Sequence, residues 1–168
     1  MGWAGVTWAV KITTRQFLPK WLGLLLAGAM LAVASLIPST LRATERWETL
    51  EAIHWIENPY NTERPGRYGE LGAYQFREAT WRMHTTVAFA RATDRRASDE
   101  VAIRHYEWLK KALLRNGIEV TPYTIAVAWN GGLRAAVRGP AAASTRDYAE
   151  RVNNIAQQMK LARVATSP

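Results

Sequence analysis

Hydrophobic positions recur with the 3.6-residue period of a helix over most of the chain. The first clear stripe begins after Thr44 and runs from Trp47 to Glu57, and the pair Asn58-Pro59 ends it, because a residue before proline disfavours helical geometry. The same period, with capping residues, predicts further helices at 78–92, 98–116, 122–129 and 145–163. Ser98 and Ser144 are expected to cap two of them, and 133–143 to form a loop. The pattern therefore predicts a mostly helical fold.

One short segment breaks this pattern. In GELGAYQF, residues 69–76, Leu71 and Gln75 alternate with Tyr74 and Phe76 at a period of two, and two glycines bracket the start. Such alternation beside turn residues favours a small β-hairpin. The predicted fold class is therefore α+β, predominantly helical, with one small hairpin inserted between helices.

The N-terminal segment has a different composition. Residues 21–37 carry no charge, Arg15 and Lys20 precede them, and the small triplet Ala32-Val33-Ala34 could serve for cleavage. A basic flank followed by an apolar run is typical of a secretion signal, and the run is just short of a transmembrane helix. We expect an exported protein, periplasmic or in the cell envelope. Cleavage and retention as a membrane anchor through 21–37 are both left open. The predicted division is 1–38 for this segment and 39–165 for the folded domain.

The net charge and the cysteine content limit the kinds of ligand that the chain can bind. The 168 residues carry a formal net charge of +8 and contain no cysteine, so disulfides and thiolate metal sites are excluded. A basic chain favours polyanions such as nucleic acid, an acidic membrane surface or an anionic cell wall. No base-reading motif and no phosphate-binding loop is present, so a nucleic-acid partner is not expected.

Glu57 is the strongest candidate for chemistry. It stands in the last turn of the first predicted helix, where the helix dipole disfavours negative charge. Trp55, Ile56 and Tyr60 are close enough in sequence to exclude water from it. Both effects raise the pKa of a carboxyl group toward the range of a general acid. A surface glutamate is the ordinary alternative, but these neighbours and the glycine-rich segment that follows favour a functional group.

Four motifs in order resemble those of soluble lytic transglycosylases and their goose-type lysozyme relatives. They are AIHWIENPYN, GELGAYQF, AVAWNGG and YAERV, and they span roughly residues 47 to 155. The stretch GAYQF with the later TW also resembles resuscitation-promoting factors, which share the lysozyme-like core. The resemblance implies a lysozyme-like domain whose hairpin lines a cleft. It also implies that glycan strands of peptidoglycan are the partner and that no cofactor is used.

The resemblance assigns roles to individual positions. It implies that Glu57 protonates the glycosidic oxygen and that Tyr148 approaches the Glu57 carboxyl group. The substrate-binding positions that it implies are Gln75, Asn130, and the aromatic cleft walls Tyr74 and Trp129. Asn58 departs from the family, which often places a serine directly after the glutamate; an amide could still donate a hydrogen bond to the carboxylate.

The reaction type depends on a second carboxylate. Hydrolases that invert or retain use a pair of Asp or Glu groups. The resemblance implies one glutamate, assistance from the N-acetyl group of the substrate, and a 1,6-anhydro product. Glu70 is a candidate accessory acid, with a solvated turn residue as its alternative. We expect cleavage of the β-1,4 bond between N-acetylmuramic acid and N-acetylglucosamine by lytic transglycosylation; hydrolysis of the same bond and a non-catalytic wall-binding module are the alternatives.

The histidines are weaker candidates. His54 lies one turn before Glu57, where a packed helix-face residue is the commoner case. His84 and His105 have no carboxylate or cysteine at ligand spacing, so no metal site is expected.

Overall fold

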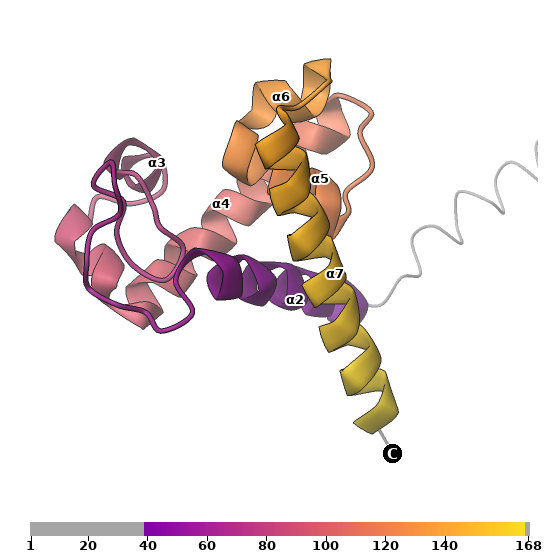
Figure 1. Ribbon diagram of the computed structural model, residues 1–168, viewed down its shortest axis with the longest axis horizontal. Helices are drawn as coiled ribbons and strands as arrows, with labels where there is room; N and C mark the ends of the chain where they lie inside the picture. Colours follow the sequence, from indigo (N-terminus) through magenta and orange to yellow (C-terminus); the bar gives the residue numbers. More distant parts are fainter. Residues whose placement is uncertain (1–38, 167–168) are drawn as a thin grey trace, which may run out of the picture. The chain divides into compact units, whose positions relative to one another are not determined.

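The described part of the chain, residues 39–166 of a computed structural model, is built from helices (Figure 1). The elements are α2 (Ser39–Glu57), α3 (Glu78–Arg82), the 3₁₀ helix η1 (Phe89–Thr93), α4 (Arg95–Arg115), α5 (Pro122–Gly131), α6 (Leu133–Arg138) and α7 (Ala143–Thr166). No strand occurs within these residues, and the prediction of a predominantly helical class is confirmed.

The N-terminal segment that we expect to be a signal or anchor lies outside the described residues. Between residues 39 and 166, none of the helices has an apolar stretch sufficient to span a bilayer.

Three helices form the main core. The C-terminal helix α7 packs against both α2 and α5, and Figure 1 shows α7 crossing α2 with α5 and α6 near its first turns. Ile53 of α2, Ile125 of α5 and Val152 of α7 are fully buried at these contacts. Farther along α7, Arg163 makes an ion pair of 2.8 Å with the buried Glu48 of α2. This packing fixes the C-terminal end of α2, where Glu57 stands.

The long connection between α2 and α4 is anchored by Trp81. Its side chain is fully buried, and its indole N–H donates a hydrogen bond of 2.8 Å to the carbonyl oxygen of Val87. That bond also explains why the helix predicted for 78–92 is wrong in its middle. Helix α3 ends at Arg82, and the chain from 83 to 88 bends back over Trp81, with the hydroxyl of Thr85 accepting from the N–H of Val87.

The predicted hairpin is reduced to a single antiparallel bridge. Leu71 and Phe76 exchange two backbone hydrogen bonds of 3.0 Å, and no further pairs extend the ladder within the described residues. Between them the chain turns with positive φ at Gly72 and at Gln75. The reversal of direction follows the prediction, but the length of the paired segment does not.

Two helix starts differ from the prediction. The N-cap of α4 is Asp94, whose side chain accepts a hydrogen bond of 3.0 Å from the N–H of Ala97, whereas Ser98 is fully buried inside the helix. Helix α7 begins at Ala143, so Ser144 lies within its first turn and is not the cap. The predicted loop at 133–143 contains α6, which its alanine-rich sequence favours.

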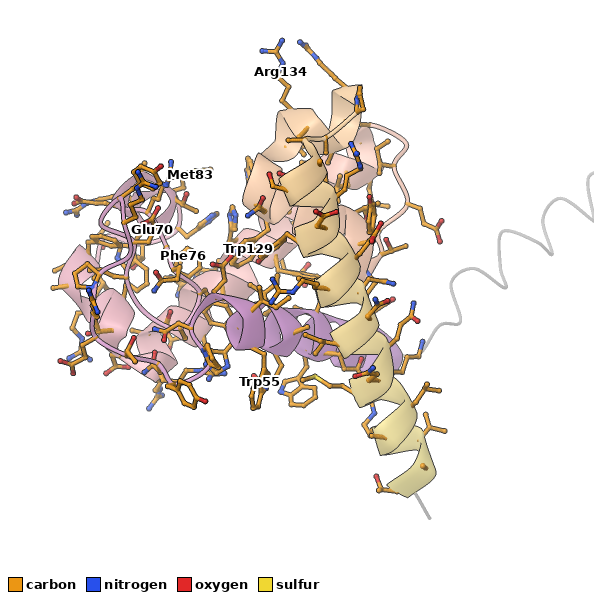
Figure 2. The ribbon with its side chains drawn as sticks, in the orientation of Figure 1. Trp55, Glu70, Phe76, Met83, Trp129 and Arg134 are labelled. Carbon is orange, nitrogen blue, oxygen red and sulfur yellow. The ribbon has the colours of Figure 1, made fainter. Side chains whose placement is uncertain are left out.

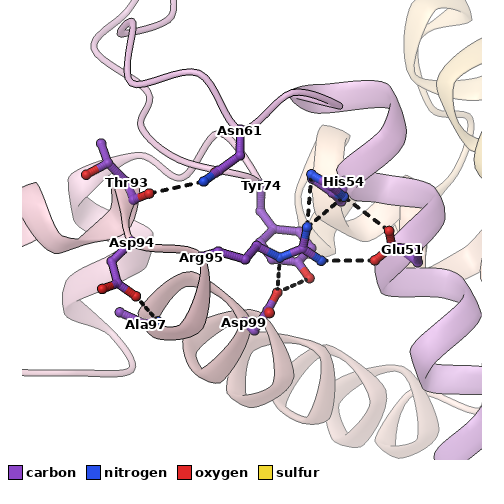
Figure 3. A network of polar contacts seen from close by, with 9 residues as sticks. All are labelled: Glu51, His54, Asn61, Tyr74, Thr93, Asp94, Arg95, Ala97 and Asp99. Atoms are coloured by element: carbon purple, nitrogen blue, oxygen red, sulfur yellow. Dashed lines mark hydrogen bonds and ion pairs between the residues drawn. The ribbon is translucent and has the colours of Figure 1, made fainter.

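A polar network behind the core joins α2 to α4 (Figure 3). Arg95 bonds to Glu51 of α2 at 3.0 Å and to Asp99 of its own helix at 2.8 Å. Asp99 also accepts a hydrogen bond of 2.7 Å from the hydroxyl of Tyr74. Arg95 lies 3.0 Å from a ring nitrogen of His54, which therefore points to this network. Asp99 and Arg95, whose guanidinium carbon lies 5.8 Å from the centre of the Tyr74 ring, thus hold the turn at 72–76 against both helices.

Candidate active site

A cleft of about 580 Å³ lies between the segment 66–77 and the ends of α2 and α5. Figure 2 shows Glu70 and Phe76 on the loop side of this region, Trp129 facing them from α5, and Trp55 on another side of α2. The lining residues are Glu57, Gly66, Arg67, Tyr68, Glu70, Tyr74, Gln75, Phe76, Arg77, Thr80, His105, Trp129, Asn130, Gly131 and Gly132. All the residues that the sequence predicts as site residues lie here, except Tyr148, which reaches the cleft through Glu57.

Glu57 is the last residue of α2 and is half-buried at the cleft wall. The hydroxyl of Tyr148, from α7, donates a hydrogen bond of 2.8 Å to Oε1 of Glu57. Burial raises the pKa of Glu57, and the nearby charge of Glu70 raises it further, whereas the Tyr148 hydrogen bond and the charge of Arg151 lower it. Because the net shift is upward, Glu57 releases its proton at a higher pH than a free carboxyl group does, and its Oε2 makes no hydrogen bond within residues 39–166.

Tyr148 is itself buried, with 8% of its surface exposed. Burial and the neighbouring Glu57 carboxylate raise the pKa of its hydroxyl, so Tyr148 stays protonated and remains a donor. The side chain therefore orients Glu57 in both protonation states of that carboxyl group.

Glu70 has a contrasting environment. Burial disfavours its charge, but hydrogen bonds from the N–H of Tyr68, from its own N–H and from Arg77 outweigh this effect, and the pKa of Glu70 is lowered. The bond from Tyr68 to Oε2 is 2.8 Å and the bond from Arg77 Nε to Oε1 is 3.2 Å. Glu57 and Glu70 are thus two carboxyl groups in one cleft whose pKa values are shifted in opposite directions. Such an arrangement suits Glu57 to act as an acid while Glu70 stays ionised.

Gln75 adopts a left-handed backbone conformation, with φ of +47°, at the turn below the cleft. Its Nε2 donates to the carbonyl oxygen of Gly72 at 3.1 Å, which leaves Oε1 to face the cleft lining. A Cβ atom on Gly66 would lie 2.6 Å from Oε1 of Gln75 and 2.7 Å from Oε2 of Glu70. The glycine at 66 is therefore what allows these two side chains to meet beside the backbone.

Asn130 lies at the end of α5 and is exposed to the cleft. Its Oδ1 accepts a hydrogen bond of 2.9 Å from the hydroxyl of Thr145, a buried residue in the first turn of α7. With that oxygen engaged, the Nδ2 group is oriented as a donor for a bound ligand. The sequence motif indicates Asn130, but Thr145 has no signal of its own beyond its place at a helix start.

The floor of the cleft is aromatic. Trp129 is half-buried and its ring lies 5.6 Å from Phe76, 6.0 Å from Tyr74 and 4.8 Å from His105 between centroids. Tyr74, which the resemblance places as a wall for stacking on sugars, has only 3% of its surface exposed, and its hydroxyl points away to Asp99. Trp129 has a face that a sugar ring could contact, whereas Tyr74 supports the floor from below.

A histidine pair closes one side of this floor. Ring nitrogens of His84 and His105 lie 2.9 Å apart, and Trp108 stacks on His105 at 5.7 Å. Burial lowers the pKa of His105 to about 3, so this wall is uncharged at neutral pH. Among residues 39–166, no three His, Cys, Asp or Glu side chains gather where they could hold a metal ion.

Asn58 does not contact Glu57 through its side chain, so the hydrogen bond that its amide could donate to the carboxylate is not formed. Its amide donates to the carbonyl oxygens of Thr62 at 2.9 Å and Gly72 at 3.2 Å, and its Oδ1 accepts from the N–H of Thr62. Asn58 therefore fixes the loop after α2 and the turn at Gly72, and Tyr148 alone bonds to the Glu57 carboxyl group within the described residues.

Comparison with family models, curated proteins and solved structures finds no match for this chain. Sequence reasoning omits four features that the geometry adds: Arg67, Tyr68 and Arg77 on the loop edge, and Thr145 behind Asn130. The three loop residues lie directly around GELGAYQF, but an Arg or Tyr in a turn carries no periodic signal by which to recognise it.

Proposed function

We propose that this domain cleaves the β-1,4 bond between N-acetylmuramic acid and N-acetylglucosamine in peptidoglycan, as a lysozyme-like lytic transglycosylase. The observation that carries the proposal is Glu57, which stands at a helix end in a polar cleft, has a raised pKa, and receives a hydrogen bond from a buried tyrosine. A carboxyl group held in this way is suited to act as a general acid.

In the proposed reaction, Oε2 of Glu57 gives its proton to the glycosidic oxygen. The bond from C1 of the muramic acid to that oxygen breaks, and the N-acetyl oxygen of the same sugar stabilises the positive charge that develops at C1. The C6 hydroxyl oxygen then bonds to C1 and gives its proton back to Glu57. The products are a 1,6-anhydro sugar and a strand that ends in a free hydroxyl, and Glu57 is again protonated.

The bonding of Glu70 favours this course over hydrolysis. A hydrolase needs a second carboxylate that is free to activate water or to attack the sugar. Each oxygen of Glu70 already accepts a hydrogen bond, from Tyr68 or from Arg77, and its side chain is 15% exposed. Under our proposal Glu70 stays ionised and raises the pKa of Glu57 through its charge.

The test uses purified peptidoglycan and the full-length chain. Glu57→Gln is expected to lower the rate of turbidity loss by about 10²–10⁴-fold while leaving the circular dichroism spectrum and sedimentation with the wall unchanged. Glu63→Gln, the same chemical change at an exposed position outside the cleft, is the matched control and should keep wild-type activity. Undiminished activity in Glu57→Gln would exclude this mechanism.

The reaction products separate the alternatives. Mass spectrometry should find anhydro ends; reducing ends would indicate a hydrolase, and Glu70→Gln would then reduce the rate about as much as Glu57→Gln. A wild-type chain that sediments with the wall but releases no fragments would indicate a non-catalytic binding module.

A further inference from the structure

The loop edge of the cleft carries two arginines around one tyrosine, a group that we call the Arg67–Tyr68–Arg77 lip. The guanidinium carbon lies 5.6 Å from the centre of the Tyr68 ring for Arg67 and 5.3 Å for Arg77. Tyr68 is 70% exposed and the Arg77 side chain is 65% exposed. Such distances allow cation–π contacts, which limit the conformations of both guanidinium groups without removing them from solvent.

The lip has more positive charge than its surroundings neutralise. Arg77 uses only Nε to bond to Glu70, at 3.2 Å, and its terminal nitrogens make no hydrogen bond within residues 39–166. Arg67 has no carboxylate partner in that part of the chain. Counting Glu70, the lip keeps one net positive charge, and both arginines belong to the cleft lining. Planar guanidinium groups are suited to bind a carboxylate.

The backbone under the lip is ordered by its own hydrogen bonds. The N–H of Gly66 donates to the carbonyl oxygen of Glu70 at 2.8 Å. The N–H of Gly69 donates to the carbonyl oxygen of Gly66 at 3.1 Å. The Glu70 side chain also accepts from the N–H of Tyr68. These bonds fix the backbone at 66–70, and the bond from Nε to Glu70 limits the Arg77 side chain, so binding requires little further ordering of the loop.

We propose that the Arg67–Tyr68–Arg77 lip is a subsite for a carboxylate carried by the glycan, and this proposal rests on the proposed function of the cleft. The carboxylate comes either from the lactyl group of the muramic acid or from a peptide attached to it. The lip thereby directs an anionic strand, in preference to a neutral one, into the cleft that holds Glu57.

The test measures affinity in the full-length Glu57→Gln chain, which does not consume its ligand. Three probes are compared: a neutral chito-oligosaccharide, a glycan strand with free lactyl carboxylates, and a strand that still bears its peptides. Arg67→Gln with Arg77→Gln should weaken binding of at least one anionic strand by about tenfold and leave the neutral oligosaccharide unaffected. Added salt should weaken binding of the anionic strands in the parent and much less in the double variant.

Two control variants test whether misfolding or a general effect of charge could account for the loss of affinity. Arg64→Gln removes a charge from an exposed position of the same loop outside the cleft and should change no affinity. Arg67→Gln alone breaks no ion pair and should show part of the loss. A larger effect on peptide-bearing strands assigns the peptide carboxylates, and a larger effect on stripped strands assigns the lactyl group.

Equal losses on all three probes, or none, would overturn the subsite while leaving the proposed function intact. A parent chain that cuts no peptidoglycan as wild type and binds no strand as Glu57→Gln would instead overturn the proposed function.

Discussion

The two walls of the cleft are held in different ways. On the helical wall, Glu57, Asn130 and Tyr148 come from the packed helices α2, α5 and α7, and side chains bond to side chains, as in the contact from Tyr148 to Glu57. On the loop wall, residues 66–77 are held mainly through the backbone, and Tyr68 and Arg77 are exposed. The first wall depends on helix packing, the second on close approaches of the main chain.

Gly72 is the position where the loop wall depends most on its backbone. Its φ is +78°, and its carbonyl oxygen accepts hydrogen bonds from the side chains of Asn58 and Gln75. A Cβ atom there would overlap the carbonyl oxygen of Ala92. On the helical wall the close approach is at Gly131, where an added Cβ atom would lie 2.8 Å from the methyl group of Thr145, which belongs to a side chain and not to the backbone. Substitutions in the loop wall should therefore change mainly the free energy of unfolding, and substitutions in the helical wall should change mainly the kinetic constants.

The largest effect is expected from Gly72→Ala. The left-handed backbone costs alanine about 1–2 kcal/mol, and the overlap with Ala92 adds about 1–3 kcal/mol. We therefore expect a loss of about 2–5 kcal/mol in the free energy of unfolding, measured by urea denaturation.

Gly69→Ala is the matched control, because φ there is +81° but no atom lies within 4 Å of an added Cβ. It should lose only the backbone contribution, about 1–2 kcal/mol. Equal losses in the two variants would mean that the close approach at Ala92 does not hold the loop wall.

The helical wall is the part that sequence reasoning anticipates best. The end of α2 at Glu57 follows from the Asn58-Pro59 pair, and the start of α5 follows from Thr121, whose side chain and that of Thr124 form a reciprocal cap. Periodicity and caps are local signals, so they indicate which residues stand at helix ends. The ends of α2 and α5 then carry Glu57 and Asn130 to the cleft, and the second turn of α7 brings Tyr148 to Glu57.

The remaining differences arise where tertiary contacts override local preference. Residues 83–88 could continue a helix, but the Trp81 indole bonds to Val87 and turns the chain. Ser98 is a good cap by type, yet Asp94 takes that role and Ser98 is buried four residues later. The positions of Arg67, Tyr68 and Arg77 depend on which way a turn faces, which no periodicity encodes.

An intermediate effect is expected from Tyr148→Phe, which removes the hydrogen bond to Glu57 but keeps the ring. A hydrogen bond to a charged group contributes about 1.5–3 kcal/mol, so we expect kcat to fall by about 10–100-fold. Tyr123→Phe, a half-buried tyrosine of α5 outside the cleft, is the control and should retain activity.

The pH profile distinguishes orientation from general damage in Tyr148→Phe. The hydrogen bond from Tyr148 stabilises the carboxylate and lowers the pKa of Glu57. Without it the pKa rises further. Because a general acid must be protonated, activity falls as pH rises through that pKa, and the alkaline limb of kcat should move to higher pH in the variant. A limb that stays in place or moves to lower pH would contradict the role assigned to Tyr148.

The smallest effect is expected from Thr145→Val, which keeps the shape of a buried side chain and removes the hydroxyl that bonds to Asn130. A neutral hydrogen bond contributes about 0.5–1.5 kcal/mol, so kcat/KM on soluble glycan strands should fall about twofold to tenfold, mainly through KM, because Asn130 would no longer be oriented as a donor. Thr145→Ser retains the hydroxyl and should stay near wild type. If the serine variant were impaired and the valine variant were not, the methyl group that packs beside Gly131 would be the important contact, and the helical wall would depend on close packing at that point as the loop wall does at Gly72.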